Sequence, residues 1–307
     1  MVKMKRVSDV RVVSTSLWVS VSDVVLNLVV AFLTGSTVML AQALQGTSDL
    51  ITGGLLLLGV KRSKRVADVE YQFGYGREIF FWVLMAGLLM FLGTGGLSLY
   101  FGYQQFMHPS EIKNVFLAIG MLVIGLLSNG YAFSLSVKRL RQTHRGAKWW
   151  RSLRHSSIIE TKATLLVDLL GTTAAALGFV TIAIFIATGN ERIDGLGSML
   201  IGLMMMIASV VLIWDVRDLI VGRAVNPRTA QEIVAAALSV EGVNNVLDLR
   251  TMYLGSGQLL VIIELHIHDG LDTDMIEKIT DRVKKLVHEN VPEAHHVQVE
   301  IETPESE

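Results

Sequence analysis

The sequence predicts a membrane-embedded, all-α bundle of six helices followed by a small C-terminal α+β domain. Hydrophobic residues make up 51% of the 307 positions and charged residues only 18%, whereas soluble domains carry about 25% charged residues. Long apolar runs fill the chain up to Leu219, and ordinary soluble composition begins after Pro227. We therefore expect an N-terminal arm over 1–14, a transmembrane domain over 15–222 and a cytoplasmic domain over 223–307.

Six apolar segments are long enough to cross a bilayer, which takes about 20 helical residues. Only helices or closed barrels satisfy the backbone in lipid, and these runs lack the alternation of barrel strands. Asp23 and Asn27 interrupt the first run, which favours a membrane helix over a cleavable signal. The expected spans are 15–36, 38–60, 78–102, 112–136, 158–188 and 195–221.

Basic residues predict the orientation, because they accumulate in short cytoplasmic loops. Sixteen Lys and Arg residues lie in the N-terminal arm and in the second and fourth loops, whereas the alternate loops hold only Lys113 and Arg192. Both termini are therefore expected in the cytoplasm, with an inner or plasma membrane as the host. Trp149 and Trp150, in the fourth loop, are expected to anchor the chain at the lipid interface.

The segment after Pro227 has the pattern of an α-β-β-α-β domain. Leu259, Val261 and Ile263 begin an alternation that predicts one buried strand face. We expect three antiparallel strands under two helices, a ferredoxin-like open sandwich. At about 80 residues this domain is small enough to gain from homodimerisation. The expected helices are 228–240 and 272–290, and the expected strands are 243–254, 258–268 and 295–302.

Three aspartates lie inside the predicted spans: Asp23 in the first, Asp49 in the second and Asp168 in the fifth. Each charged carboxylate at a helix centre costs on the order of 2.5–3.5 kcal/mol. The three together cost roughly 9 kcal/mol, which is comparable to the net stability of a whole domain. Some bound or paired group must offset that cost.

Spacing indicates what the offsetting group is, since residues three, four, seven and eight apart share one helix face. Three such polar stripes occur: Ser20, Asp23 and Asn27; Gln42, Gln45 and Asp49; Glu160, Thr164 and Asp168. Their oxygens can enclose a dication, and protons can replace it when it leaves. Outward movement costs about 2.3 kcal/mol per charge per 100 mV, so returning protons would ease export. The alternative is that these residues pair between helices only for packing.

Local motifs then add a resemblance. They are Gln45-x-x-x-Asp49, Thr164-x-x-x-Asp168 and, after the second span, Ala67-Asp68 with Phe73-Gly74-Tyr75-Gly76-Arg77-Glu78. With six spans, these motifs make the chain resemble the cation diffusion facilitator family, in its zinc-transporter-like branch. The resemblance implies homodimeric antiporters that export zinc or related dications in exchange for protons. It also implies a transport site of Gln45, Asp49, Thr164 and Asp168, to which Asp23, Asn27 and Gln42 are candidate additions as ligands or proton relays.

The transport-site motif departs from the family pattern at two positions that affect which metal is bound. The family often has His or Asp at the positions of Gln45 and Thr164. Imidazole suits zinc, whereas carboxylate and carbonyl oxygens suit Mg, Ca and Mn. The expected cargo is a dication of the zinc, manganese, iron(II) or cobalt class, and the donor set favours manganese, iron(II), cobalt or magnesium over zinc. The metal is a substrate, and no cofactor is expected.

The resemblance implies two further metal sites. One lies in the loop after the second span, where Asp68 is accompanied by Tyr71 and Tyr75; phenols are poor ligands, so we expect this site to be lost. The other lies in the cytoplasmic domain, and its candidates are Glu264, His266, His268, His295 and His296. The alternative for the second set is a solvated strand face.

Two other functions compete with transport. A non-transporting scaffold, partner subunit or metal sensor is suggested by the neutral Gln45 and Thr164. An intramembrane enzyme is disfavoured, because the chain has no His-Glu-x-x-His helix and no cysteine nucleophile. A net charge of −1 also disfavours a nucleic-acid partner.

Overall fold

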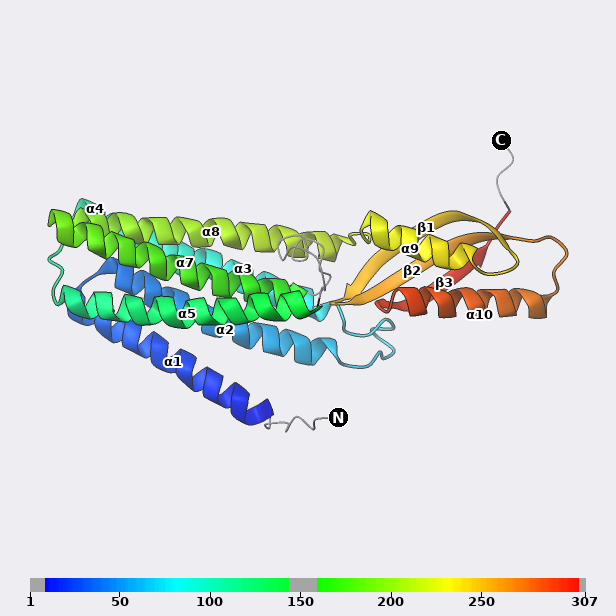
Figure 1. Cartoon of the computed structure of the whole chain (residues 1–307), viewed down its shortest axis with the longest axis horizontal. Helices are drawn as coiled ribbons and strands as arrows, with labels where there is room; N and C mark the ends of the chain where they lie inside the picture. Colours follow the sequence, from blue (N-terminus) through cyan, green and yellow to red (C-terminus); the bar gives the residue numbers. More distant parts are fainter. Residues whose placement is uncertain (1–8, 144–158, 304–307) are drawn as a thin grey trace. The chain divides into compact units, whose positions relative to one another are not determined.

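The computed structural model describes residues 9–143 and 159–303 (Figure 1), with side chains from Val21 onward except at 139–143, 160 and 161. Trp149, Trp150 and most of the N-terminal arm lie outside these residues, so their predicted roles stay predictions. The chain divides into two compact units. The first holds most of the helical part, and the second joins 59–81 to everything from Val216 onward.

The apolar part of the described chain folds into six successive helical spans, which are α1 (Asp9–Thr34), α2 (Thr37–Ser63), the continuous α3 (Glu78–Leu89), η1 (Met90–Gly96) and α4 (Leu97–Met107), α5 (Val115–Thr143), α7 (Ile159–Thr188) and α8 (Arg192–Val221). Five are long and apolar enough to cross a membrane, and α1 contributes the shorter apolar stretch Val21–Thr34 among the described residues. The predicted helical membrane domain is confirmed.

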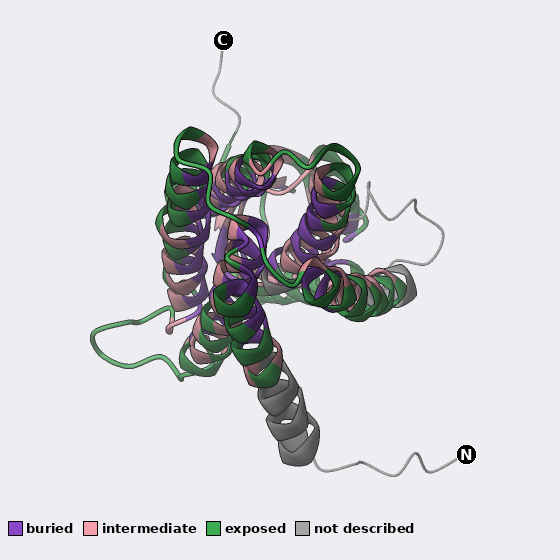
Figure 2. Cartoon of the chain, turned by 90° about the vertical axis from the view of Figure 1, so that its left-hand side faces the viewer, coloured by how far each residue is buried: buried purple, intermediate pink, exposed green. Residues whose placement is uncertain are grey.

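Burial follows the helix faces in the way expected for a bundle surrounded by lipid. Figure 2 shows the buried residues on the inner sides of the helices and the exposed residues on the outer sides. Large apolar residues such as Phe32 and Phe116 are almost fully exposed, at 89% and 88%. In a soluble protein such apolar surface would be unfavourable, whereas hydrocarbon solvates it.

The third span packs against α8 through glycines. A methyl group at Gly102 would lie 2.7 Å from the Gly195 carbonyl oxygen, and one at Gly202 would lie 2.8 Å from the Gly95 carbonyl oxygen. Close backbone approach through small residues is the usual way helices associate in membranes. The π-helical turn η1, which includes Gly95, is a feature that the apolar pattern did not predict.

Asp194, near the start of α8, caps the N-terminus of α2. Its buried carboxylate accepts hydrogen bonds from Ser36 Oγ and Thr37 N at 2.5 Å, from Thr37 Oγ1 at 2.8 Å and from Val38 N at 3.3 Å. A carboxylate at this position satisfies free N–H groups and complements the helix dipole. The contact fixes where α2 begins, and therefore which residues face inward further along it.

The C-terminal domain has the predicted element order, with α9 (Pro227–Leu238), β1 (Val243–Gly255), β2 (Gln258–Ile267), α10 (Thr273–Asn290) and β3 (Ala294–Ile301). Asn226 and Asp272 cap the two helices by accepting from Thr229 N and Met275 N. Alternate residues of β2, from Leu259 to Ile267, are buried. The α+β fold class is confirmed.

The prediction of three antiparallel strands was wrong in one pairing. The sheet order is β1-β2-β3, with β1 antiparallel and β3 parallel to β2. A hairpin can join only antiparallel neighbours, whereas parallel neighbours need a crossover of a dozen or more residues. Here α10 provides that crossover and returns the chain to the end of the sheet at which β2 begins. Alternation within a strand carries no information on its direction.

Candidate transport site

Polar residues from three helices meet in one cavity inside the helical unit. The cavity has a volume of about 20 Å³ and is lined by Asp23, Asn27, Gln42, Gln45, Gly46, Asp49, Met121, Leu122, Gly125 and Asn129. The first two residues belong to α1, the next four to α2 and the last four to α5. The polar stripes predicted on the first two spans therefore converge, as their spacing indicated.

Asp49 is the residue to which the other polar groups connect. Its Oδ2 accepts a 2.8 Å hydrogen bond from Nε2 of Gln45, which is 3% exposed. It also interacts electrostatically with Asp168 and with Asp23. Asp49 and each of these two carboxylates repel one another, and a bound cation or added protons relieve that repulsion.

Glycines on α7 allow this helix to approach α2 and α5 closely. A methyl group at Gly171 would lie 2.8 Å from Gln45 Nε2 and 3.1 Å from Asn129 Oδ1, and one at Gly178 would lie 2.8 Å from Leu122 Cδ2. Any larger side chain would displace these neighbours. The small residues thus bring the helix that carries Asp168 next to the helix that carries Asp49.

Asp168 is held by a residue that the sequence analysis missed. Its Oδ2 accepts a short hydrogen bond from Ser136 Oγ of α5. Asn129, which lines the cavity, was also missed. Residues 129 and 136 are seven apart and share one face of a largely apolar span. The stripe argument that found Asp23 and Asp49 would have found them if it had been applied to the fourth span.

The four residues of the predicted transport site lie on α2 and α7. Gln45 and Asp49 line the cavity, Asp168 interacts with Asp49 from α7, and Thr164 is exposed four residues before Asp168. Glu160 lies outside the described side chains. The geometry thus brings Gln45 and the two aspartates together, and Thr164 lies one helical turn before Asp168 on α7.

The loop after α2 brings Asp68, Tyr71 and Tyr75 together through hydrogen bonds. Tyr75 Oη donates to Asp68 Oδ2 at 2.7 Å, and Tyr71 N and Glu70 N donate to Oδ1 at 2.8 and 3.0 Å. These hydrogen bonds hold the pKa of the Asp68 carboxyl below its usual value, and the bond from Tyr75 has the largest effect. Protein donors thus engage both carboxylate oxygens, which supports the expected loss of this site.

The same loop packs on the C-terminal domain within one compact unit. A methyl group at Gly76 would lie 2.5 Å from the Leu254 carbonyl oxygen, at the β1–β2 turn. The Phe73 ring meets the His296 ring edge-on, with centroids 5.9 Å apart. The loop is therefore a structural part of the domain that follows the last span.

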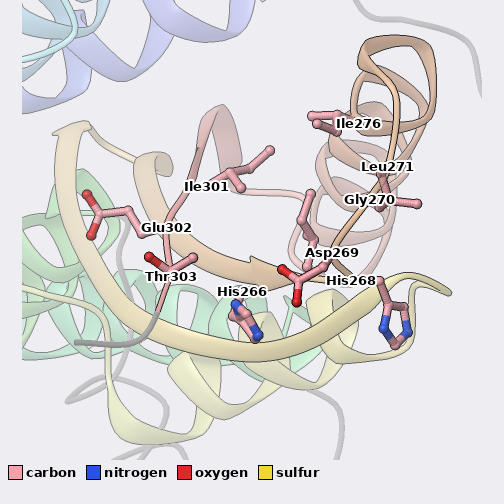
Figure 3. A pocket seen from close by; sticks show the side chains of 10 residues that line it. His266, His268, Asp269, Gly270, Leu271, Ile276, Ile301, Glu302 and Thr303 are labelled. Atoms are coloured by element: carbon pink, nitrogen blue, oxygen red, sulfur yellow. The ribbon is translucent and has the colours of Figure 1, made fainter. Parts of the chain in front are cut away.

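The candidate metal ligands of the C-terminal domain are dispersed. His266 and His268 border an open pocket of about 600 Å³ with Asp269 and Glu302, and Figure 3 shows His268 and Glu302 on opposite sides of it. The others lie elsewhere: Glu264 pairs with Arg250 at 3.8 Å, His295 contacts His288 and His296 contacts Phe73. No group of three or more His, Asp or Glu suited to a metal occurs among the described residues.

A bundle of apolar helices around carboxylates and amides, joined to a small α+β domain, defines a multi-pass membrane protein with a polar site in its interior. The cation efflux transmembrane domain matches residues 13–221, and the cation efflux protein cytoplasmic domain matches residues 225–304. The chain therefore belongs to the cation efflux family of metal transporters, the cation diffusion facilitators, and the resemblance seen in its motifs is confirmed. Members of this family are transporters rather than enzymes.

Individual relatives are similar at low identity. The mitochondrial proton-coupled zinc antiporter SLC30A9 of Homo sapiens is 29% identical over 232 residues, which cover 74% of this chain and 40% of that protein. Metal tolerance protein C4 of Arabidopsis thaliana is 23% identical, covering 96% and 74%. The cation-efflux pump FieF of Salmonella newport is 24% identical, covering 84% and 81%. The chain thus spans about 40% of the length of SLC30A9.

Proposed function

We propose that the chain is a homodimeric secondary transporter that exports a divalent metal cation from the cytoplasm in exchange for protons. The observation that carries this proposal is the Asp49 carboxylate, which is hydrogen-bonded to Gln45 and interacts with Asp23 and Asp168 from two other helices. Membership of a metal-transporting family supports the class of function. The name of the relative SLC30A9, a proton-coupled zinc antiporter, supports the exchange.

The carboxylates supply the coupling. With a dication bound, Asp49 and Asp168 can both stay ionised; when the cation leaves, their repulsion in a medium of low dielectric constant favours proton uptake. Cation and protons therefore compete for the same oxygens, which is the physical requirement for exchange. Ser136 orients Asp168 and Gln45 orients Asp49, so each carboxylate keeps an ordered position.

The donor set favours a hard or borderline cation. Among the described residues, the polar side chains that line the cavity are carboxylates and amides, and none is a histidine. Oxygen donors suit manganese and magnesium, whereas zinc is commonly bound by imidazole or thiolate. We propose manganese, iron(II) or cobalt as the preferred cargo, with zinc as a weaker one. The basic loops support cytoplasmic termini in an inner or plasma membrane.

A flux assay with purified protein in proteoliposomes under an imposed pH gradient tests this function. Mn, Fe(II), Co, Zn, Cd and Mg would be compared, with internal pH and metal recorded together. Asp49→Ala and Asp168→Ala are expected to abolish metal-dependent proton flux while the proteins stay folded. Glu111→Gln, which changes an exposed loop carboxylate, is the matched control and should keep full activity. Full flux in both aspartate variants would refute the proposal.

A non-transporting scaffold, partner subunit or metal sensor is the second candidate. The neutral side chains of Gln45 and Thr164 favour it, because they stand where stronger metal ligands often occur in the family. This candidate predicts no flux for any dication, together with metal-dependent stabilisation of the protein or a stable complex with an active transporter.

A further inference from the structure

We infer that Gln42 and Asn129 are specificity-determining ligands that hold the cation in the cavity between α1, α2 and α5. This inference rests on the proposed transport function and extends it beyond Gln45, Asp49, Thr164 and Asp168. Gln42 lies seven residues before Asp49, about 10 Å along α2 toward its first turn. Gln42 therefore extends the site from Asp49 toward the N-terminal end of α2.

The size and charge of the cavity suit one partly dehydrated cation. Its volume of about 20 Å³ exceeds the 10–15 Å³ or so that one water needs. It cannot hold a complete hydration shell, so protein oxygens would have to replace the lost waters. The lining provides two carboxylates and four amides, namely Asp23, Asp49, Asn27, Gln42, Gln45 and Asn129. Two carboxylates match the charge of a dication.

Two of the amides already have their N–H groups engaged by the protein. Asn27 Nδ2 donates to the Asp23 carbonyl oxygen at 2.9 Å, and Gln45 Nε2 donates to Asp49 at 2.8 Å. An amide whose nitrogen is engaged keeps its oxygen as an acceptor. Asn27 and Gln45 therefore contribute oxygen to the cavity, and a cation requires oxygen there.

Gln42 is the amide that points to a missing ligand. Its side chain is 6% exposed, and among the described residues its Nε2 is one of few buried polar atoms without a hydrogen-bond partner. Buried polar groups are almost always satisfied, so such an exception needs an explanation. Turning the amide by half a turn exchanges nitrogen for oxygen. The same side chain can then coordinate a cation inside the cavity that it lines.

Asn129 of α5 lines the cavity and lies next to Gly171 of α7. Its Oδ1 lies close to Gly171, since a methyl group there would be 3.1 Å from that oxygen. The same methyl group would be 2.8 Å from Gln45 Nε2. The absence of a side chain at Gly171 thus leaves room for both amides beside Asp49. Asn129 is the polar side chain that α5 contributes to the cavity.

Gln42→Leu and Asn129→Ala test the inference in the proteoliposome assay, with Mn²⁺ and Zn²⁺ as the probes. Manganese prefers six oxygen ligands, whereas zinc accepts four. Loss of one oxygen is therefore expected to raise the KM for Mn²⁺ roughly tenfold, as loss of an ordered metal-site partner does, and to raise the KM for Zn²⁺ less. Gln42→Asn, which keeps a neutral amide oxygen, should stay nearer to the wild-type Mn²⁺ to Zn²⁺ ratio than Gln42→Leu does.

Ser48→Ala is the matched control, because Ser48 Oγ is also a buried atom of α2 without a partner but does not line the cavity. It should leave both KM values unchanged. Gln42→Leu should melt no lower than wild type, since an apolar group replaces an unsatisfied amide. An unchanged Mn²⁺ to Zn²⁺ ratio in both cavity variants would overturn the inference and leave the cavity as a water site. Absence of wild-type flux would instead overturn the proposed function.

Discussion

Single glycines set the spacing between the helices that carry the polar cavity. Gly171 and Gly178 of α7 face Gln45 and Leu122 at distances that exclude a side chain. In a bilayer no hydrophobic force holds helices together, so close packing and interhelical hydrogen bonds decide the association. The positions of Asp49 and Asp168 therefore depend on residues that themselves carry no charge.

Gly171→Ala is expected to lower metal flux by a factor on the order of ten to a hundred, because a shift of about 1 Å in an ordered site has that effect. The added methyl group must displace Gln45 Nε2 or Asn129 Oδ1. Gly120→Ala on α5, where a methyl group meets nothing within 4 Å, is the control and should behave as wild type. Equal flux in the two variants would contradict the packing argument.

Tyr253 gives a prediction for pH dependence in the C-terminal domain. Burial, and then the nearby charge of Glu293, raises the pKa of this phenol to about 12. Because the folded-state pKa lies above the unfolded value of about 10, the stability linked to the neutral phenol is complete below pH 10 or so. It is lost as the pH rises toward about 12.

Difference absorbance at 295 nm between wild type and Tyr253→Phe checks this prediction across the alkaline range. The folded protein should show one tyrosine that ionises near pH 12 and is missing from the variant. In denaturant the same tyrosine should ionise near its ordinary pKa of about 10. A folded-state titration near 10 would show that the phenol is not buried.

At the scale of elements, contacts at a helix end and within a loop fix the conformation of the chain around α2. The loop after α2 keeps its shape through the Tyr75–Asp68 hydrogen bond, and the Arg65 guanidinium stacks 4.4 Å from the Tyr75 ring centroid. The start of α2 is fixed by Asp194 of α8. Residues distant in sequence thus determine the rotation of the helix that presents Gln42, Gln45 and Asp49.

Asp194→Ala is expected to destabilise the helical unit by about 2 kcal/mol, the upper end for loss of an N-cap, because several donors lose their shared acceptor. Thermal unfolding in detergent measures the loss, and flux should fall as well, since the first turn of α2 loses its anchor. Asp194→Asn keeps one acceptor oxygen and should lose less. Asp272→Ala removes the N-cap of α10 and should leave flux unchanged. A wild-type melting temperature for Asp194→Ala would argue against the cap.

At the scale of the whole molecule, exchange requires that the two ends of the bundle face different compartments. In the sequence, Lys and Arg residues gather in the N-terminal arm and in the segments after the second and fourth spans, whereas the alternate loops hold only Lys113 and Arg192. Such an asymmetry fixes orientation during insertion. The asymmetry supports the proposed orientation, with both termini in the cytoplasm.

The natural chain contains no cysteine, so single cysteines report orientation without background. Glu111→Cys and Glu241→Cys each place a thiol at an exposed position, the first in the loop before α5 and the second in the C-terminal domain. In intact cells a membrane-impermeant maleimide should label position 111 and spare position 241 until the membrane is opened. The reverse pattern would invert the proposed direction of export.

Periodicity in the sequence was sufficient for the fold class, the helical spans, the order of the C-terminal elements and the converging faces of α1 and α2. These properties are local, because hydrocarbon and a half-buried sheet each demand one repeating pattern along a single segment. The pairing of Gln45 with Asp49 follows from helix geometry alone, since the two residues lie one turn apart.

Only the tertiary structure decided which faces of different segments meet. It brought Asn129 and Ser136 of α5 to the aspartates, left Thr164 exposed, set Asp194 at the start of α2 and ran β3 parallel to β2. Each of these contacts joins residues far apart in the chain, and the free energy of such a contact depends on how neighbouring elements pack. A one-dimensional pattern shows that a polar residue must find a partner, whereas only the packed bundle determines which partner it finds.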